Sequence, residues 1–331
     1  MGKLIALIGD LHFGCKNFDH DILEVQLNSL EKYKDILKEK NCSTIYQLGD
    51  MFDNRKLIDL KLLHTLSTRF RNIFEGFNFY TFAGNHDMYN RDNRDIVSSE
   101  LFADLLGIKY IKEPSYHIFG KHKIGISPWL CGDEELLKEC DILLGHAELK
   151  GFKYNHTSIA EEGLNIDNSK YKKVYMGHYH FNQNNVYIGT PYQMTFNEIN
   201  SVPGIILLNE NLEEEFIENT WDRRYFTVTV LKDKIILQYK DEPELFTGNL
   251  PDFCKVGKIV LKEKNEKEDK ILEYFGARAR ISKVFYKYEE EKLYESVSLN
   301  NSVAESLDFI KEYILKEHKH LESVLNDVIN N

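Results

Sequence analysis

Apolar positions follow two rhythms in the first eighty residues. Residues 4–8 form a continuous apolar run, which is typical of a strand that is buried on both faces. Residues 44–48 are expected to form another buried strand, and residues 77–82 a third strand. Residues 21–40 and 57–74 lie between these runs, and their apolar positions recur three to five apart, as in helices. The order strand, helix, strand, helix, strand predicts an α/β fold with parallel neighbouring strands.

The rest of the chain is richer in strands. Helices are expected there at residues 99–106 and 133–140. The expected strands are residues 109–111, 117–119, 123–127, 142–145, 173–177, 185–188 and 204–208. An alternating first half followed by a strand-rich half predicts an α/β class fold, a two-sheet sandwich flanked by helices.

Two further parts are expected after this sandwich. A small α/β capping or DNA-binding domain at residues 222–292 would contain strands at 226–232, 234–239, 258–262 and 278–288, around a helix at about 266–275. The main domain then occupies residues 1–221, and a helical tail occupies residues 293–331. In the tail, Ser302 and Glu305 have the spacing of a capping box, and two apolar stripes follow. One bent helix and two helices both fit these stripes.

Composition narrows the class of protein. With 331 residues and 42% hydrophobic content, the chain can bury the core of one large domain with smaller additions. No apolar stretch is long enough to cross a bilayer, so no membrane contact is expected. The five cysteines have no paired or metal-type spacing, which favours reduced thiols in a cytoplasmic protein, in the host cytoplasm if the chain is viral. The net charge of −11 argues against strong autonomous binding to nucleic acid, although bound cations would reverse the field of metal-site carboxylates.

Metal-binding side chains stand at the ends of five apolar runs. The motifs are Gly9-Asp10-Leu11-His12, Gly49-Asp50-Met51-Phe52-Asp53, Gly84-Asn85-His86-Asp87, Gly145-His146 and Gly177-His178-Tyr179-His180. A single Gly-Asp pair or a lone histidine says little, but five such motifs after successive strands predict one site. The candidate ligands are Asp10, His12, Asp50, Asn85, His146, His178 and His180.

This ligand set predicts two metal ions. In an extended segment, residues two apart point to the same side, so Asp10 and His12 can act together, as can His178 and His180. Asp50 has two carboxylate oxygens that can bridge two cations. Two carboxylates, one amide and four imidazoles are too many for one four-coordinate zinc, but they suit two ions with open positions for water and substrate.

Three residues of the same motifs are not counted among the metal ligands, and each is assigned another role. His86 adjoins a ligand and is interpreted as the catalytic residue that donates a proton to the leaving oxygen; the alternative is that it orients a ligand. Asp53 and Asp87 are each expected to accept a hydrogen bond from a ligand or to hold a loop.

The order of these motifs resembles that of the calcineurin-like metallophosphoesterases. Within that superfamily, the chain is most similar to the SbcD-type nuclease subunits of DNA double-strand-break repair, especially their bacteriophage recombination endonuclease relatives. Further points of similarity are Pro128-Trp129, Gly145 to Leu149, Tyr187 to Pro191 and Trp221 to Arg224. Protein serine/threonine phosphatases carry Arg-Gly after the second motif, whereas Asn54-Arg55 follows Asp53 here, so that class loses support.

The resemblance implies specific roles and partners. The first metal would bind Asp10, His12, Asp50 and His180, and the second would bind Asp50, Asn85, His146 and His178. The cofactor would be two Mn²⁺ ions, and the activity would be exonuclease and endonuclease cleavage of DNA in recombination and repair. The partner would be an SMC-like coiled-coil ATPase, with the chain as a homodimer within a heterotetramer. Nucleotide or cyclic-nucleotide phosphodiesterases share the metal motifs and remain an alternative, and an inactive scaffold is a third.

Basic residues near the motifs could track a DNA backbone. The candidates are Arg91, Arg94, Lys150, Lys153, Arg278 and Arg280. For each of them, ordinary solvated surface is an equally good interpretation.

Overall fold

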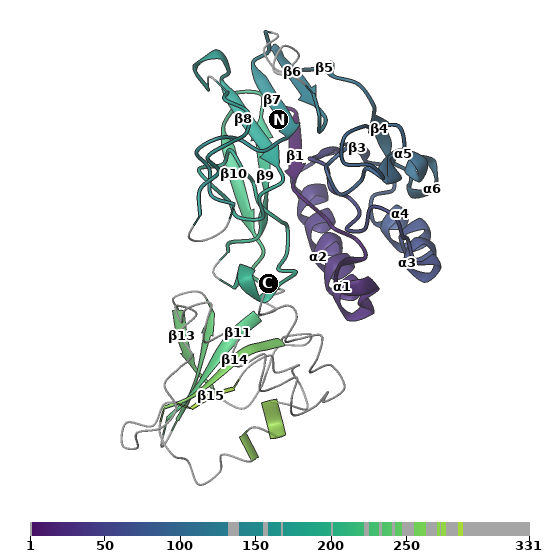
Figure 1. The fold of residues 1–331 in the computed structure, drawn as a ribbon. Coiled ribbons are helices and arrows are strands. Elements are labelled where there is room, and N and C mark those ends of the chain that lie inside the picture. Colours follow the sequence, from purple (N-terminus) through teal and green to yellow (C-terminus); the bar gives the residue numbers. More distant parts are fainter. Residues whose placement is uncertain are drawn as a thin grey trace, which may run out of the picture. The chain divides into compact units, whose positions relative to one another are not determined.

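The protein was analysed as a computed structural model, which describes residues 2–131, 139–154, 158–166, 168–199, 201–221, 225–231, 234–239, 242–246, 255–262, 270–271, 273–275 and 284–286. Within these residues the strands form three sheets (Figure 1). The expected tail at 293–331 and most of the expected helix at 133–140 lie outside the described residues. Among the described helices, none has both the length and the apolar character that a bilayer span requires.

The first sheet has six strands in the order β10-β9-β1-β2-β3-β4. Its strands are β1 (Leu4–Ile8), β2 (Thr44–Gln47), β3 (Asn78–Phe82), β4 (Lys109–Ile111), β9 (Gly204–Asn209) and β10 (Glu214–Glu218). The first four run parallel, while β9 pairs antiparallel with β1 and β10 pairs antiparallel with β9. The expected strands are confirmed, but β10 was not expected, and β9 joins the first sheet although it comes from the strand-rich half of the chain.

The helices lie on one side of this sheet (Figure 1). They are α1 (Cys15–Phe18), α2 (His20–Glu39), α3 (Leu60–Thr65), the π-helical turn η1 (Leu66–Phe70), α4 (Arg71–Ile73), α5 (Ser98–Leu101) and α6 (Ala103–Leu106). Helix α2 begins after Asp19, whose carboxylate accepts hydrogen bonds from the amides of Asp21 and Ile22. The helix expected at 99–106 is interrupted at Phe102, where the backbone leaves the helical region (φ −105, ψ 7).

The second sheet has four strands, β5 (Ser115–Phe119), β6 (His122–Ser127), β7 (Ile142–His146) and β8 (Lys173–Gly177). Strands β6, β7 and β8 run parallel. The strand expected at 185–188 is wrong. Asn184 and Asn185 have positive φ in a turn, and Tyr187 forms only isolated bridges to Met176 and Gln183.

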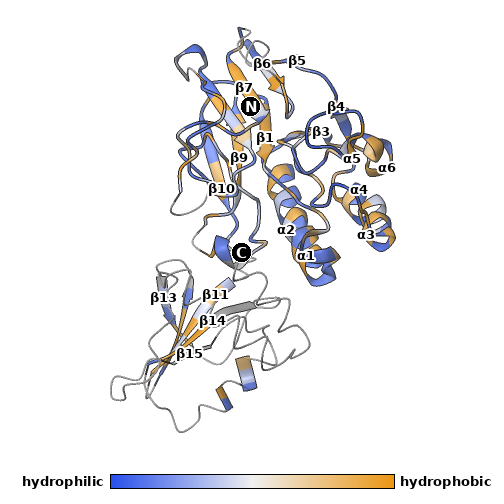
Figure 2. Ribbon diagram, viewed as in Figure 1, coloured by the Kyte–Doolittle hydropathy of each residue, from blue (hydrophilic) through white to orange (hydrophobic). Residues whose placement is uncertain are grey.

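The two sheets pack face to face, and a second core lies between the first sheet and the helices. Ile5 and Leu7 of β1 contribute to the core between the sheets, whereas Ala6 and Ile8 contribute to the core under the helices. Successive residues of a strand point to opposite faces, so a strand buried on both faces must be apolar throughout. Figure 2 shows this apolar character along the central strands, and it explains the continuous run at residues 4–8.

The third sheet has the order β13-β12-β11-β14-β15 and has its own apolar cluster around Phe226, Val228, Ile259 and Phe275. Its strands are β11 (Tyr225–Val230), β12 (Ile235–Tyr239), β13 (Glu242–Leu245), β14 (Lys255–Leu261) and β15 (Val284–Tyr286). Strand β13 was not expected. Residues 270–271 and 273–275 are helical, as expected for that part of the segment. The boundaries at residues 221 and 292 stay predictions.

Candidate metal centre

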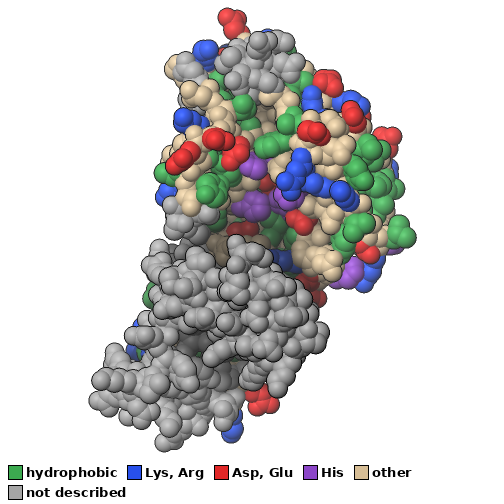
Figure 3. Space-filling view, viewed as in Figure 1, with side chains coloured by type: hydrophobic (Ala, Val, Ile, Leu, Met, Phe, Trp, Pro, Cys, Tyr) green, Lys and Arg blue, Asp and Glu red, His purple; other side chains and the backbone are tan. Residues whose placement is uncertain are grey.

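The seven candidate ligands converge where parallel strands of both sheets end. The side chains form three groups of potential metal ligands, and within each group the ligand atoms all lie within 4.8 Å of one another. They are Asp10, His12 and His180; His12, Asp50 and His86; and Asp50, His146 and His178. Asn85 joins the third group, because its Oδ1 lies 3.0 Å from His146 Nε2 and 2.9 Å from His178 Nδ1. Figure 3 shows several histidine side chains close together on the face in view.

The backbone at the strand ends is strained in three ligand residues. His12, Asp50 and His178 have φ values of 46°, 54° and 103°, in the left-handed region that non-glycine residues rarely adopt. Such conformations cost about 1–3 kcal/mol each and cluster at functional sites. Three such conformations therefore coincide with residues of the candidate ligand set.

Glycines in the motifs allow the loops to approach closely. A side chain at Gly84 would come within 2.2 Å of the Asp50 backbone nitrogen, and one at Gly177 would come within 2.2 Å of the Leu48 carbonyl oxygen. A Cβ cannot occupy either position without moving the backbone. The glycines before Asn85 and His178 are therefore required by these close backbone contacts.

The two carboxylates are buried and fixed by backbone amides. Asp10 and Asp50 are each 1% exposed. The His178 amide donates to both oxygens of Asp10 at 3.1 Å, and the His86 amide donates to Asp50 Oδ1 at 2.6 Å. Asp50 Oδ2 lies 3.7 Å from His12 Nε2 and 3.4 Å from His146 Nε2, so Asp50 stands between the two ends of the site.

Two imidazoles are oriented by hydrogen bonds on their outer nitrogens. His146 Nδ1 donates to the Leu48 carbonyl oxygen at 2.6 Å, and His180 Nδ1 donates to the buried carboxylate of Glu198 at 3.0 Å. These bonds place the proton on Nδ1 and leave the Nε2 lone pair of each ring facing the centre, which is how metal-binding histidines are commonly held.

The atoms that meet at the centre fit cations. His12 Nε2 and His180 Nε2 face each other at 3.1 Å, while Nδ1 of His12 lies 3.2 Å from Asp53 Oδ1. His146 Nε2 faces the Asn85 and Asp50 oxygens, which are also acceptors. Acceptors repel one another unless a proton or a metal ion lies between them. The donor set of oxygen and imidazole nitrogen, without thiolate among the described residues, fits divalent transition metals.

The pKa values of His146 and His178 also indicate that the site favours one positive charge among its imidazoles. Burial opposes the charged form of His146, but Asp50 and Asp10 outweigh burial and raise the pKa of His146 to about 9. Burial, followed by the charge on His146, lowers the pKa of His178 to about 4. The carboxylates therefore stabilise a cation among these rings, and a bound metal would supply that charge and displace the proton.

His86 lies beside the ligands with one nitrogen restrained. Its Nδ1 donates to the Asp53 carbonyl oxygen at 2.7 Å, and its ring contacts the His12 ring edge-on with centroids 4.8 Å apart. Because His86 belongs to a ligand group with His12 and Asp50, its position suits either proton donation to a substrate or a ligand role.

The two neighbouring aspartates hold the site in different ways. Asp53 lies beside His12 through its carboxylate and accepts from His86 through its carbonyl. Asp87 is fully buried and accepts hydrogen bonds from the amides of Phe52 and Gly84, which ties the second and third motif loops together. Burial and the charge of Asp50 raise the pKa of Asp87 to about 7.

Three residues near the site were not assigned from the sequence. Glu198 orients His180, and its carboxylate also accepts from the amides of Met194 and Thr195. The Thr195-x-x-Glu198 spacing of a capping box could have indicated it. Trp129 packs against His178 with ring centroids 5.1 Å apart. Arg55 has a buried Nη1 atom without a hydrogen-bond partner.

The residues predicted to contact DNA differ in their exposure and in whether other residues already bind them. Arg94 donates to the Lys112 carbonyl oxygen and pairs with Glu113 at 3.3 Å, which favours a structural role. Arg91, Lys150 and Lys153 are exposed. Arg278 and Arg280 lie outside the described residues. Figure 3 shows Lys and Arg side chains close to the histidines on the same face.

Comparisons with known proteins agree with this geometry. The sequence matches the family described as calcineurin-like phosphoesterase over residues 3–182, more than half of the chain. It is also 32% identical over 236 residues to the protein named exonuclease subunit 1 of Enterobacteria phage T4, an alignment that covers 66% of this chain and 69% of the phage protein. The chain therefore belongs to the calcineurin-like phosphoesterase family and is a metal-dependent phosphodiesterase.

Proposed function

We propose that this enzyme is a DNA nuclease that uses two manganese ions. The observation that carries the proposal is the set of three adjoining ligand groups, two of which share Asp50, in a chain similar to a phage exonuclease subunit. Asp10, His12, Asp50 and His180 would hold one ion, and Asp50, Asn85, His146 and His178 the other. The ions would acidify a water molecule and neutralise the charge of the phosphate.

The protein groups would perform the remaining steps. The backbone amides of His86 and His178 keep Asp50 and Asp10 fixed, so the ligands need no rearrangement when substrate binds. Protonated His86 would donate from Nε2 to the departing sugar oxygen, while its Nδ1 stays bonded to the Asp53 carbonyl. Exposed Arg91 would contact phosphates of the bound strand. None of these groups reads bases by hydrogen bonding, so we expect cleavage at many sequences.

Manganese is proposed over magnesium because of the ligand chemistry. Four imidazoles suit a transition metal, whereas magnesium favours shells made of oxygen atoms. Protein stripped of metal should cut DNA when Mn²⁺ is returned and should cut poorly with Mg²⁺. Equal rates with the two metals would contradict the assignment.

Duplex DNA and a cyclic nucleotide provide the decisive pair of substrates. A nuclease should degrade DNA with Mn²⁺ and leave the cyclic nucleotide intact. The reverse result would favour the alternative, a nucleotide or cyclic-nucleotide phosphodiesterase. Absence of turnover on any phosphodiester, in protein that carries both ions, would favour a scaffold.

A partner ATPase is also part of the proposal. The relative is named a subunit, which supports work within an assembly. We propose that the tail at residues 293–331 docks onto the coiled coil of an SMC-like ATPase, that the chain forms a homodimer in that complex, and that it acts in recombination and repair in the cytoplasm, of the host if viral. Removing residues 298–331 should abolish co-purification of the ATPase but leave cleavage of a small phosphodiester. An insoluble or metal-free truncated protein would contradict this role of the tail.

A further inference from the structure

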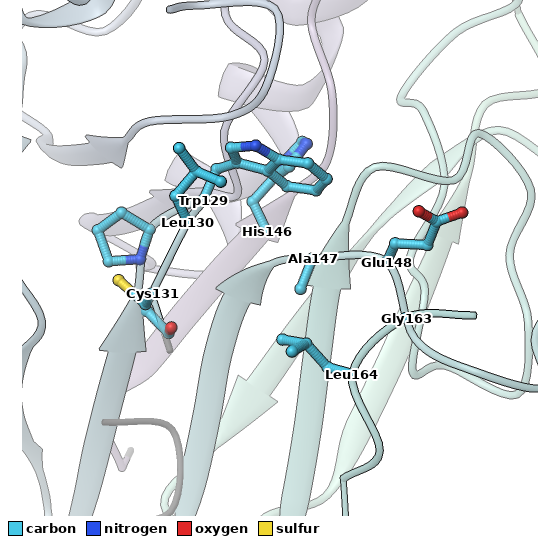
Figure 4. A pocket seen from close by; sticks show the side chains of 10 residues that line it. Trp129, Leu130, Cys131, His146, Ala147, Glu148, Gly163 and Leu164 are labelled. Atoms are coloured by element: carbon cyan, nitrogen blue, oxygen red, sulfur yellow. The ribbon is translucent and has the colours of Figure 1, made fainter. Parts of the chain in front are cut away.

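A cavity of about 220 Å³ opens beside the metal centre (Figure 4). Its walls include Trp129, Leu130, Ala147 and Leu164, and His146 forms the wall that it shares with the metal centre. Glu148 stands at its margin, where its carboxylate accepts a hydrogen bond from the Tyr179 hydroxyl. A group attached to a phosphate at the centre would therefore reach this cavity within a short distance.

Trp129 connects the cavity to the ligands. Its indole packs against the His178 ring at 5.1 Å with the planes tilted by 35°, and against His146 at 5.7 Å. The Trp129 amide donates to the Ala83 carbonyl oxygen at 2.8 Å, which anchors the residue to the end of β3. The indole is thus a fixed aromatic surface, and stacking on it costs little conformational entropy.

Leu130, which lines the cavity, has an unusual backbone conformation and an unusually exposed side chain. It has a φ of 61° and is 45% exposed, although a leucine disfavours both the left-handed region and contact with water. Strain of this kind persists where the surrounding structure requires it, and it is commonly found at ligand sites.

The chemistry of the walls selects an uncharged planar group. Among the described residues that line the cavity there is no lysine or arginine, and Glu148 would repel a phosphate. The volume corresponds to several water molecules of about 30 Å³ each, which is the scale of one ring system and is too small for a protein segment. Nucleobases are uncharged, planar and stack well on tryptophan.

We propose that this cavity binds one nucleobase of the substrate strand, next to the scissile phosphate, by stacking against Trp129. The inference rests on the proposed nuclease function and specifies its substrate as a strand with an accessible, unstacked base. A base within a duplex is not available for such stacking, so the strand end must open by at least one pair for the cavity to fill. Stacking tolerates every base, which agrees with cleavage at many sequences.

A binding experiment tests the cavity without requiring cleavage. The chain has two tryptophans, and Trp221 packs on Tyr33 outside the cavity, so Trp221→Phe leaves Trp129 as the single reporter. With Mn²⁺ present, deoxyadenosine 5′-monophosphate should quench its fluorescence in a saturable manner. Deoxyribose 5-phosphate, which lacks a base, should bind roughly ten-fold or more weakly and should not quench. Equal binding of the two compounds without quenching would overturn the proposal.

A matched pair of variants locates the base. Leu164→Phe in the same background fills the cavity and should remove the advantage of the base. Ile118→Phe adds the same ring on β5 at a residue that is 76% exposed and outside the cavity, and the advantage should persist. If Leu164→Phe retains both the quenching and the advantage, the base lies elsewhere and the proposal falls.

Cleavage of oligonucleotides separates this inference from the proposed function. In the unmodified protein, one abasic position next to the cut should raise KM by about ten-fold, while abasic positions elsewhere should have little effect. Equal KM values at all positions would overturn the base site and leave the nuclease function standing. Base-dependent quenching in a protein that cuts no oligonucleotide would retain the base site and reject the nuclease function.

Discussion

The six-stranded sheet and the four-stranded sheet meet at the metal centre, but they contribute different side chains. Strands β1, β2 and β3 lead into both carboxylates, the amide and the imidazoles of His12 and His86. Strands β7 and β8 lead into three imidazoles, those of His146, His178 and His180. Among the candidate ligands, the negative charge therefore comes from one sheet, and the other sheet supplies ligands that carry no charge when a metal is bound.

This difference has an energetic consequence. A buried carboxylate is stable when it is neutralised, and Asp10 and Asp50 depend on cations and on backbone amides for that. An imidazole needs only a partner for its second nitrogen, which Leu48 and Glu198 provide for His146 and His180. A change at Asp50, the carboxylate that both proposed metal shells share, should therefore disturb both metals, while a change at His146, His178 or His180 should disturb one.

The largest effect is expected from Asp50→Asn. The change removes the charge that lies between the two clusters, so activity should fall to background and neither ion should bind tightly. His146→Gln, on the other side, should retain the ion held by Asp10, His12 and His180. Metal content by elemental analysis measures both variants, and Asp141→Asn, a carboxylate at the opposite end of β7, is the control. Two tightly bound ions in Asp50→Asn would contradict the proposal that both metals depend on Asp50.

His86→Gln should have the next largest effect, on turnover alone. Loss of a general acid typically lowers the rate by about 10²–10⁴-fold. The variant should bind both ions with the affinity of the unmodified protein, because His86 is not needed to complete either shell. A rate on DNA close to that of the unmodified enzyme would show that His86 only positions the ligands around it.

Glu198→Gln should have a smaller effect, confined to one metal. Glu198 orients His180, and loss of such a partner commonly lowers metal affinity by about 10–100-fold. Titration of metal into stripped protein should show one weakened site and one unchanged site. If both sites weaken equally, the two sides of the centre are not separable in this way.

The smallest effect concerns the stability of metal-free protein above pH 6.5. The pKa of His146 is raised from its ordinary value of 6.5 to about 9, because Asp50 and Asp10 outweigh burial. This stabilisation is fully present below pH 6.5 and is lost as the pH rises through 9. Chelated protein should therefore melt a few degrees lower at pH 9 than at pH 6.5.

The melting temperature of metal-loaded protein should not fall in this way between pH 6.5 and pH 9, because a metal ion binds the neutral imidazole and takes the place of the proton. In His146→Gln the dependence on pH should flatten. Thermal melts of the chelated and loaded forms at the two pH values provide the measurement, and an unchanged slope in the variant would assign the dependence to other groups.

The local pattern determined much of the fold and most of the candidate site. Strand β1 is a continuous apolar run because both of its faces are buried, and the mostly apolar strands β2 and β3 run beside it, so the sequence marks where each one ends. Since the carboxyl ends of adjacent parallel strands share an edge, the sequence alone places the candidate ligands that follow them in one group. Strand β10 and the break at Phe102 carried weaker signals, because short or half-exposed elements depend on their neighbours.

The tertiary structure decided the contacts between distant parts of the chain. The sequence by itself determined which ligand types stand after which strands, through steric and burial rules that act within a few residues. It could not determine that Glu198 reaches His180, that Trp129 packs on His178, that β9 pairs with β1, or that Arg94 is occupied by Glu113. The physical reason is that each of these contacts joins residues that are separated along the chain and meet only when the chain has folded. The spacing of residues along the chain does not indicate which distant residues will come into contact.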